Sequence, residues 1–238
     1  FSPFVIRAVS SMDALSPVDK NPESQLLLAC ARAQIEPDRT ENIRPFFRED
    51  LNWDHLISVA ETNRMIPSLY WHLSLVGCEQ VPEPYLASLK RYAHGAAVRD
   101  LYLTREFYRI LDHFERRGIE VIPHKGPILA HYLYENPTLK ESRDLELFAR
   151  KENMLQIEEL LGEVGYHPAH DRSLSRDTAC LQFGNSYAFC RSQPKINLEV
   201  MWLIPPPYFS RSLDLGDLWR RSQEVALDGR TVRILAPE

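Results

Sequence analysis

The fold is decided by residues 118–151, which read GIEVIPHKGPILAHYLYENPTLKESRDLELFARK. Residues 119–122 form a short β-branched run, which predicts a strand. Residues 123–126 break that run, and Pro127 opens an apolar helical pattern, since proline is favoured at the first position of a helix. Residues 144–148 then alternate acidic and apolar side chains, which is the period of a strand. The stretch therefore predicts strand, turn, helix, loop and strand.

Two acidic side chains share one face of the second predicted strand. Asp144 and Glu146 project together, because side chains alternate along a strand, and the intervening leucines point toward a core. Neighbouring carboxylates repel each other unless a cation lies between them. Mg²⁺ takes carboxylate oxygens and keeps positions open for water and phosphate. The pattern predicts a cation site, and the alternative is an edge strand whose acids simply face water.

A glycine turn and a third acid add to this pair. Lys125 and Gly126 lead into the predicted helix, and the backbone N–H groups at a helix N-terminus favour anions. The turn is therefore a candidate phosphate cradle, to which Lys125 adds a positive charge. Glu199 lies in a later strand-like run, residues 196–203. A glycine turn, an acid pair and a later acid are together typical of a nucleotidyltransferase site.

The chain resembles a bacterial family of uncharacterised nucleotidyltransferases within the polymerase-beta-like superfamily. The resemblance covers most of residues 51–238 and includes helices predicted over 52–60 and 64–69. It rests on these motif residues: Lys125-Gly126, Tyr132 or Tyr134, Lys140, Asp144-Leu145-Glu146 and Glu199-Val200-Met201-Trp202.

This resemblance implies an α+β fold, with a polymerase-beta-like mixed sheet flanked by helices and an N-terminal helical region. It implies an enzyme that moves a nucleoside monophosphate from an NTP, with ATP as the expected donor, using Mg²⁺ or Mn²⁺. The acceptor, a small molecule or a protein or peptide, stays open. The implied metal ligands and catalytic residues are Asp144, Glu146 and Glu199. The implied nucleotide- and phosphate-binding residues are Lys125, Gly126, Lys140 and Arg143.

Four positions depart from the family pattern. Lys140 stands where arginine is usual, Glu146 replaces an aspartate, and Met201 replaces a histidine. Pro127 follows the turn glycine where the superfamily usually has serine. These departures keep an alternative open, namely a catalytically degenerate nucleotide-binding, regulatory or interaction module on the same fold.

Composition narrows the class of protein. The 238 residues carry a net charge of −5, which argues against wrapping a long nucleic acid. No apolar run approaches the roughly 18 residues that span a bilayer, so no membrane partner is expected. The four cysteines form no C-x-x-C pair, and no export signal precedes them, which favours a cytoplasmic protein with reduced thiols.

Three regions follow from the chain pattern. We expect an arm, in part disordered, over residues 1–23, a helical region over 24–117, and the nucleotidyltransferase core over 118–238. The resemblance implies a further C-terminal helical lobe beyond residue 238. Residues 84–117 predict one long helix whose interspersed charges favour a solvated face.

Two local predictions concern less distinctive residues. Residues 178–190 predict a β-hairpin that turns near Gly184 and Asn185. His124, beside the glycine turn, is either a site residue or a turn histidine bonded to backbone, and we favour the second interpretation.

Overall fold

The computed structural model describes residues 21–31, 43–46, 51–76, 78–134, 136–169, 178–203 and 215–236. Most of the predicted arm, residues 1–20, lies outside these ranges. The chain divides into two compact units. The helical unit comprises Phe1–Arg99, Leu133–Glu141 and Pro237–Glu238, and the sheet unit comprises Asp100–Tyr132 and Ser142–Ala236. The boundary expected between residues 117 and 118 stays a prediction.

In the helical unit, asparagine side chains cap the starts of α1 and α2. The side-chain oxygen of Asn52 accepts a hydrogen bond from the backbone N–H of His55 at 3.0 Å at the start of α2. Leu56, Leu69 and Leu73 are fully buried in its core. Its helices are α1 (Pro22–Cys30), α2 (Trp53–Thr62), α3 (Ile66–Val76), the first part of α4 (Glu83–Glu115) and the 3₁₀ turns Arg44–Phe46, Cys78–Gln80 and Pro137–Leu139.

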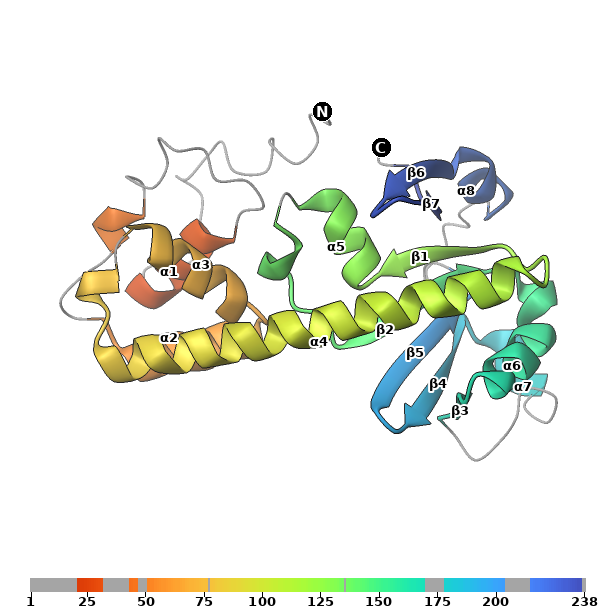
Figure 1. Ribbon diagram of the computed structural model, residues 1–238, viewed down its shortest axis with the longest axis horizontal. Coiled ribbons are helices and arrows are strands. Elements are labelled where there is room, and N and C mark those ends of the chain that lie inside the picture. Colours follow the sequence, from red (N-terminus) through yellow and green to blue (C-terminus); the bar gives the residue numbers. More distant parts are fainter. Residues whose placement is uncertain are drawn as a thin grey trace. The chain divides into compact units, whose positions relative to one another are not determined.

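The sheet unit contains a mixed five-stranded sheet in the order β1-β2-β5-β4-β3 (Figure 1). β2 and β5 are parallel neighbours, and every other pair in the sheet is antiparallel. The strands are β1 (Val121–Lys125), β2 (Asp144–Ala149), β3 (His167–Pro168), β4 (Ser186–Ser192) and β5 (Lys195–Met201). A separate hairpin is formed by β6 (Gln223–Leu227) and β7 (Arg230–Ile234).

One face of the sheet packs on helices. Leu145 and Leu147 of β2 and Val200 of β5 are fully buried in one core with Phe107 of α4 and Leu161 of α6. The helices of the unit are the later part of α4, α5 (Pro127–Leu133), the 3₁₀ turn Lys151–Asn153, α6 (Met154–Glu163), α7 (Thr178–Phe183) and α8 (Leu215–Arg221). The structure confirms the predicted α+β fold class, with a mixed sheet flanked by helices.

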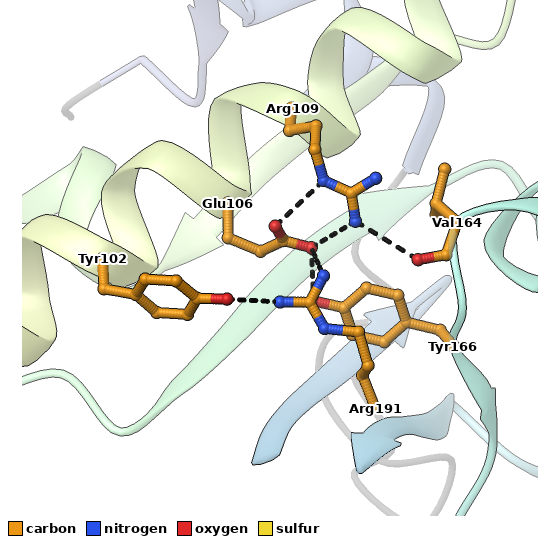
Figure 2. Close-up of polar contacts among 6 residues, drawn as sticks. All are labelled: Tyr102, Glu106, Arg109, Val164, Tyr166 and Arg191. Carbon is orange, nitrogen blue, oxygen red and sulfur yellow. Dashed lines mark hydrogen bonds and ion pairs between the residues drawn. The ribbon is translucent and has the colours of Figure 1, made fainter. Parts of the chain in front are cut away.

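A buried carboxylate joins α4 to the helix-covered side of the sheet unit. Glu106 of α4 accepts hydrogen bonds from Arg109 at 2.6 Å, Arg191 of β4 at 2.8 Å and the Tyr166 hydroxyl at 3.0 Å (Figure 2). Arg191 also donates to the Tyr102 hydroxyl at 2.6 Å. We call these five residues the Glu106 cluster. Glu106 departs from the solvated face expected for the charges of this helix, because it is 5 % exposed.

Two strand predictions need correction. β1 extends through Pro123 to Lys125 instead of stopping at residue 122. Proline is tolerated there because β1 is an edge strand, and the outer side of an edge strand needs no backbone N–H for sheet pairing. Residues 178–183 form α7, and the hairpin partner of β4 is β5. The ring N–H of Trp202 donates to the carbonyl of Gly184 at 3.0 Å, which holds the residue after α7 against the end of β5.

Candidate functional site

Strand register brings the three predicted acids together. β2 and β5 pair so that Asp144 lies opposite Asn197 and Glu146 lies opposite Glu199. Side chains at paired positions of adjacent strands project from the same face. Asp144, Glu146 and Glu199 therefore form a row on the sheet face opposite the main core, and we call them the acid row.

The start of β2 is held in place by buried polar contacts. The backbone N–H of Ser142 donates to the Asp100 carboxylate at 3.0 Å, and both residues are buried. Leu145 and Leu147 then anchor the strand in the core with no exposed surface. A slip of one residue would exchange the leucines with the acids, so burial of the leucines fixes the face on which the acid row lies.

A lysine from the edge strand compensates part of the negative charge. The ammonium of Lys125 lies 3.0 Å from a carboxylate oxygen of Glu146, and β1 pairs Lys125 with Glu146 across an irregular step after Pro123. The lysine side chain is 63 % exposed, whereas that of Glu146 is 12 % exposed. Because the lysine end of the pair is solvated, its cation can move to another anion at little cost.

A serine orients the third acid. The hydroxyl of Ser186 on β4 donates to a carboxylate oxygen of Glu199 at 2.5 Å. Ser186 and Ala188 alternate on this face of β4, and their small side chains leave space beside the acid row. Sequence reasoning did not single out Ser186, because its neighbour on β5 depends on register that no local motif reports.

The turn glycine lies directly against the acid strand. Gly126 has φ +94°, and a Cβ atom at this position would lie 3.3 Å from the backbone oxygen of Asp144. Both the left-handed conformation and the close approach require glycine. α5 begins immediately after it, where the N–H of Ala130 donates to the Gly126 carbonyl at 3.1 Å. The turn that sequence reasoning chose as a phosphate cradle thus adjoins Asp144.

His124 stands beside the same acids. Its Nδ1 atom is buried and has no hydrogen-bond partner among the described residues, which differs from the backbone-bonded turn histidine that we favoured. Burial and the charge of Lys125 lower the pKa of His124, and the negative charges of Glu146 and Glu199 offset this only in part.

The other two predicted phosphate ligands are at the surface. Lys140 is exposed and belongs to the helical unit. Arg143 belongs to the sheet unit, is exposed, and directly precedes β2. Their roles stay predictions.

The donor chemistry of the acid row suits a hard divalent cation, since three carboxylates on adjacent strand positions supply only oxygen ligands. In the described ranges, however, no three His, Cys, Asp or Glu side chains converge on one metal-sized point. Instead, Glu146 forms an ion pair with Lys125, and Glu199 accepts a hydrogen bond from Ser186. A bound cation would replace Lys125 as the counter-charge of Glu146, with Asp144 and Glu199 as the further ligands.

No helix of the described part combines the length and apolarity needed to cross a bilayer.

Comparisons with known proteins identify the family of the chain. A family profile described as uncharacterised nucleotidyltransferase matches residues 49–238. Among curated proteins nothing matches. A solved structure, the lincosamide antibiotic adenylyltransferase LnuA with lincomycin bound, is similar at 14% sequence identity and a TM-score of 0.39. That similarity covers 56% of this chain and 79% of that chain.

Proposed function

The chain belongs to the uncharacterised nucleotidyltransferase family, and we propose that it transfers a nucleoside monophosphate from an NTP, with ATP as the expected donor, to an acceptor hydroxyl. The acceptor oxygen bonds to the α-phosphorus of the NTP while the bond from that phosphorus to its bridging oxygen breaks. Pyrophosphate leaves with the bridging electron pair, and the acceptor proton passes to a carboxylate of the chain.

The observation that supports this proposal most is the pairing of Glu146 with Glu199 across parallel strands, with Asp144 on the same face. Half-buried carboxylates repel one another, and a row without enough counter-charge lowers stability unless a cation or substrate compensates it. Such a row beside a glycine turn is expected where a metal–phosphate complex binds.

Glu199 has two roles in this scheme, and the other residues have one each. Asp144, Glu146 and Glu199 would hold Mg²⁺ or Mn²⁺, which would stabilise negative charge on the transferring phosphoryl group. Lys125 is exposed and lies next to Gly126, so it can leave Glu146 and bind the β- and γ-phosphates. Glu199, oriented by Ser186, accepts the proton of the acceptor hydroxyl.

A second candidate function is a nucleotide-binding or regulatory module without turnover. The ion pair of Lys125 with Glu146 and the hydrogen bond of Ser186 to Glu199 favour it, because both already satisfy carboxylates that catalysis needs. Nucleotide binding without release of pyrophosphate would identify this function.

The test measures thermal shifts of the protein with ATP, GTP, CTP or UTP, each with and without Mg²⁺. The control is the double variant Asp144→Asn, Glu146→Gln. We expect a Mg²⁺-dependent rise in Tm with one nucleotide, lost in the variant. Pyrophosphate release is then measured with that nucleotide and candidate acceptors. The absence of a shift with all four nucleotides would contradict both candidate functions.

A further inference from the structure

A cavity of about 480 Å³ lies at the carboxyl ends of β2 and β5 in the sheet unit. This volume falls within the roughly 300–1,000 Å³ of small-molecule sites. Its aromatic and cationic lining residues are Phe148, Arg150, Lys151, Phe183, Trp202 and Trp219. Neither the acid row nor the glycine turn contributes to it, so it is a second site.

The cavity wall holds a preorganised arginine. The ring of Trp219 stacks on the fully buried Phe148, with centroids 5.7 Å apart. The guanidinium of Arg150 lies over the Trp219 ring, 4.3 Å from its centroid. Stacking uses the face of a guanidinium and leaves the N–H groups on its edge to bind a carboxylate or phosphate. The ion pair of Arg150 with Glu120 spans 3.7 Å and is exposed, so Glu120 competes only weakly with such a ligand for the guanidinium.

The remaining lining residues add an apolar surface and a further charge. The side chain of Phe183 is 70% exposed, which leaves an aromatic ring in contact with solvent at the cavity. Lys151 is also exposed there, and Glu152 is the acidic side chain of the lining. A ligand with an aromatic body would cover Phe183, and a negatively charged end would meet Arg150.

The cavity lies at one end of the acid row. Phe148 follows Asp144 and Glu146 at every second residue of β2, so these three lie on one side of the strand. Arg150 directly follows β2, and its guanidinium lies over the Trp219 ring that stacks on Phe148. Strand geometry puts the Cα atoms of Glu146 and Arg150 about 13 Å apart. A molecule bound between them would have its anionic end at Arg150 and its other end at the proposed reaction centre.

We propose that this cavity binds the acceptor, a small molecule with a flat apolar body and a carboxylate or phosphate at the end remote from the reacting hydroxyl. The assignment as acceptor rests on the proposed nucleotidyl transfer. The prediction that the cavity binds this class of ligand does not rest on that transfer, because the cavity is formed without the acid row.

The test uses 4-phenylbutyrate as a probe, with the neutral 4-phenylbutanol and the cationic 4-phenylbutylamine as matched compounds. The readout is the indole N–H resonance of Trp219 in a ¹H–¹⁵N spectrum, assigned with Trp219→Phe. We expect a saturable shift with the carboxylate only. Arg150→Gln should weaken this binding at least tenfold. The control is Arg233→Gln, because Arg233 also pairs with Glu120 but does not line the cavity.

Two further measurements separate this inference from the proposed function. The variant Asp144→Asn, Glu146→Gln should bind the probe like the wild type, even though it loses the Mg²⁺–nucleotide response. ATP with Mg²⁺ should leave the probe bound. Displacement of the probe by ATP would assign the cavity to the donor and overturn the acceptor role. Equal shifts with all three compounds, or an unchanged affinity in Arg150→Gln, would overturn recognition of an anion.

Discussion

The acid row and the Glu106 cluster are two groups of charges on opposite faces of one sheet, and they differ in how completely the charge is satisfied. In the Glu106 cluster, one carboxylate receives hydrogen bonds from two arginines and a tyrosine (Figure 2). In the acid row, three carboxylates share one exposed lysine and one serine hydroxyl among their short contacts. The carboxylate of the first group is paired with several donors, whereas those of the second have few partners.

This difference separates structural from functional charge. A buried polar network with every member paired rigidifies the fold, and removing one member leaves the others uncompensated. A row of partly compensated carboxylates is under electrostatic repulsion, and such groups concentrate at functional sites. Substitutions in the Glu106 cluster should therefore reduce stability, and substitutions in the acid row should reduce activity.

The largest expected effect is that of Asp144→Asn on the proposed transfer. The substitution keeps the shape of the side chain and removes one charge from the row. Activity should fall on the order of 10²–10³-fold, as for loss of one preorganised electrostatic group. The unfolding free energy should change by less than about 0.5 kcal/mol, since repulsion within the row is relieved. Pyrophosphate release and urea denaturation check both values, and wild-type turnover in the variant would refute the catalytic role.

Glu106→Gln should show the reverse pattern. It leaves Arg191, whose side chain is 15 % exposed, without a charged partner, and should reduce the unfolding free energy by about 3 kcal/mol. The matched control is Glu163→Gln, because Glu163 pairs with Arg117 at the surface and should contribute at most about 1 kcal/mol. Urea denaturation of both variants measures the difference. Equal losses would show that burial of the Glu106 cluster contributes nothing.

The same carboxylate predicts a pH dependence of stability. Burial raises the pKa of Glu106, but the hydrogen bonds and charges of Arg109 and Arg191 outweigh it and hold the pKa below its ordinary value of 4.5. The stabilisation is thus complete above about pH 4.5 and is lost as the pH falls through the lowered pKa. Stability of the wild type should decline more steeply between pH 5 and pH 3 than that of Glu106→Gln. Parallel curves for the two proteins would contradict this assignment.

Gly126→Ala should have an intermediate effect on stability and a specific effect on the site. Gly118 is the control, because it also has positive φ, +70°, but open space where a Cβ would lie. Both alanine variants should lose about 1–2 kcal/mol from backbone strain. Gly126→Ala should lose more, because its Cβ meets the Asp144 backbone, and it alone should weaken Mg²⁺–nucleotide binding. Equal nucleotide affinity in both variants would remove the turn from the site.

Sequence reasoning predicted the elements of the site because their signals are local. The alternation around Asp144 reports a strand face, and Pro127 reports the start of α5. The opposition of Glu146 and Glu199 follows from pairing between strands far apart in the chain, which no local pattern encodes. The hydrogen bond of Ser186 to Glu199 depends on that same pairing.

The Glu106 cluster shows the same limit from the opposite direction. Along α4, Glu106 and Arg109 have the three-residue spacing of an ordinary surface ion pair, so the local pattern gives no sign of burial. The burial of Glu106 comes from Arg191 and Tyr166, which folding of the sheet unit brings to α4. His124 is similar, since only the irregular pairing of β1 with β2 at this point puts its imidazole near the acid row.

The smallest effect on stability is expected for Lys125→Gln. This variant removes the one short ion pair of the acid row in the described structure, so it sharpens the comparison of the acid row with the Glu106 cluster. The lysine is 63 % exposed, so the unfolding free energy should change by less than about 0.5 kcal/mol. Affinity for the Mg²⁺–nucleotide should nevertheless fall about tenfold, or about 1.4 kcal/mol, because the phosphates lose a cation. Lys195→Gln, at the exposed start of β5, is the matched control and should change neither quantity. A variant that binds nucleotide as tightly as the wild type but unfolds more easily would make Lys125 a structural partner of Glu146, and the acid row would then resemble the Glu106 cluster.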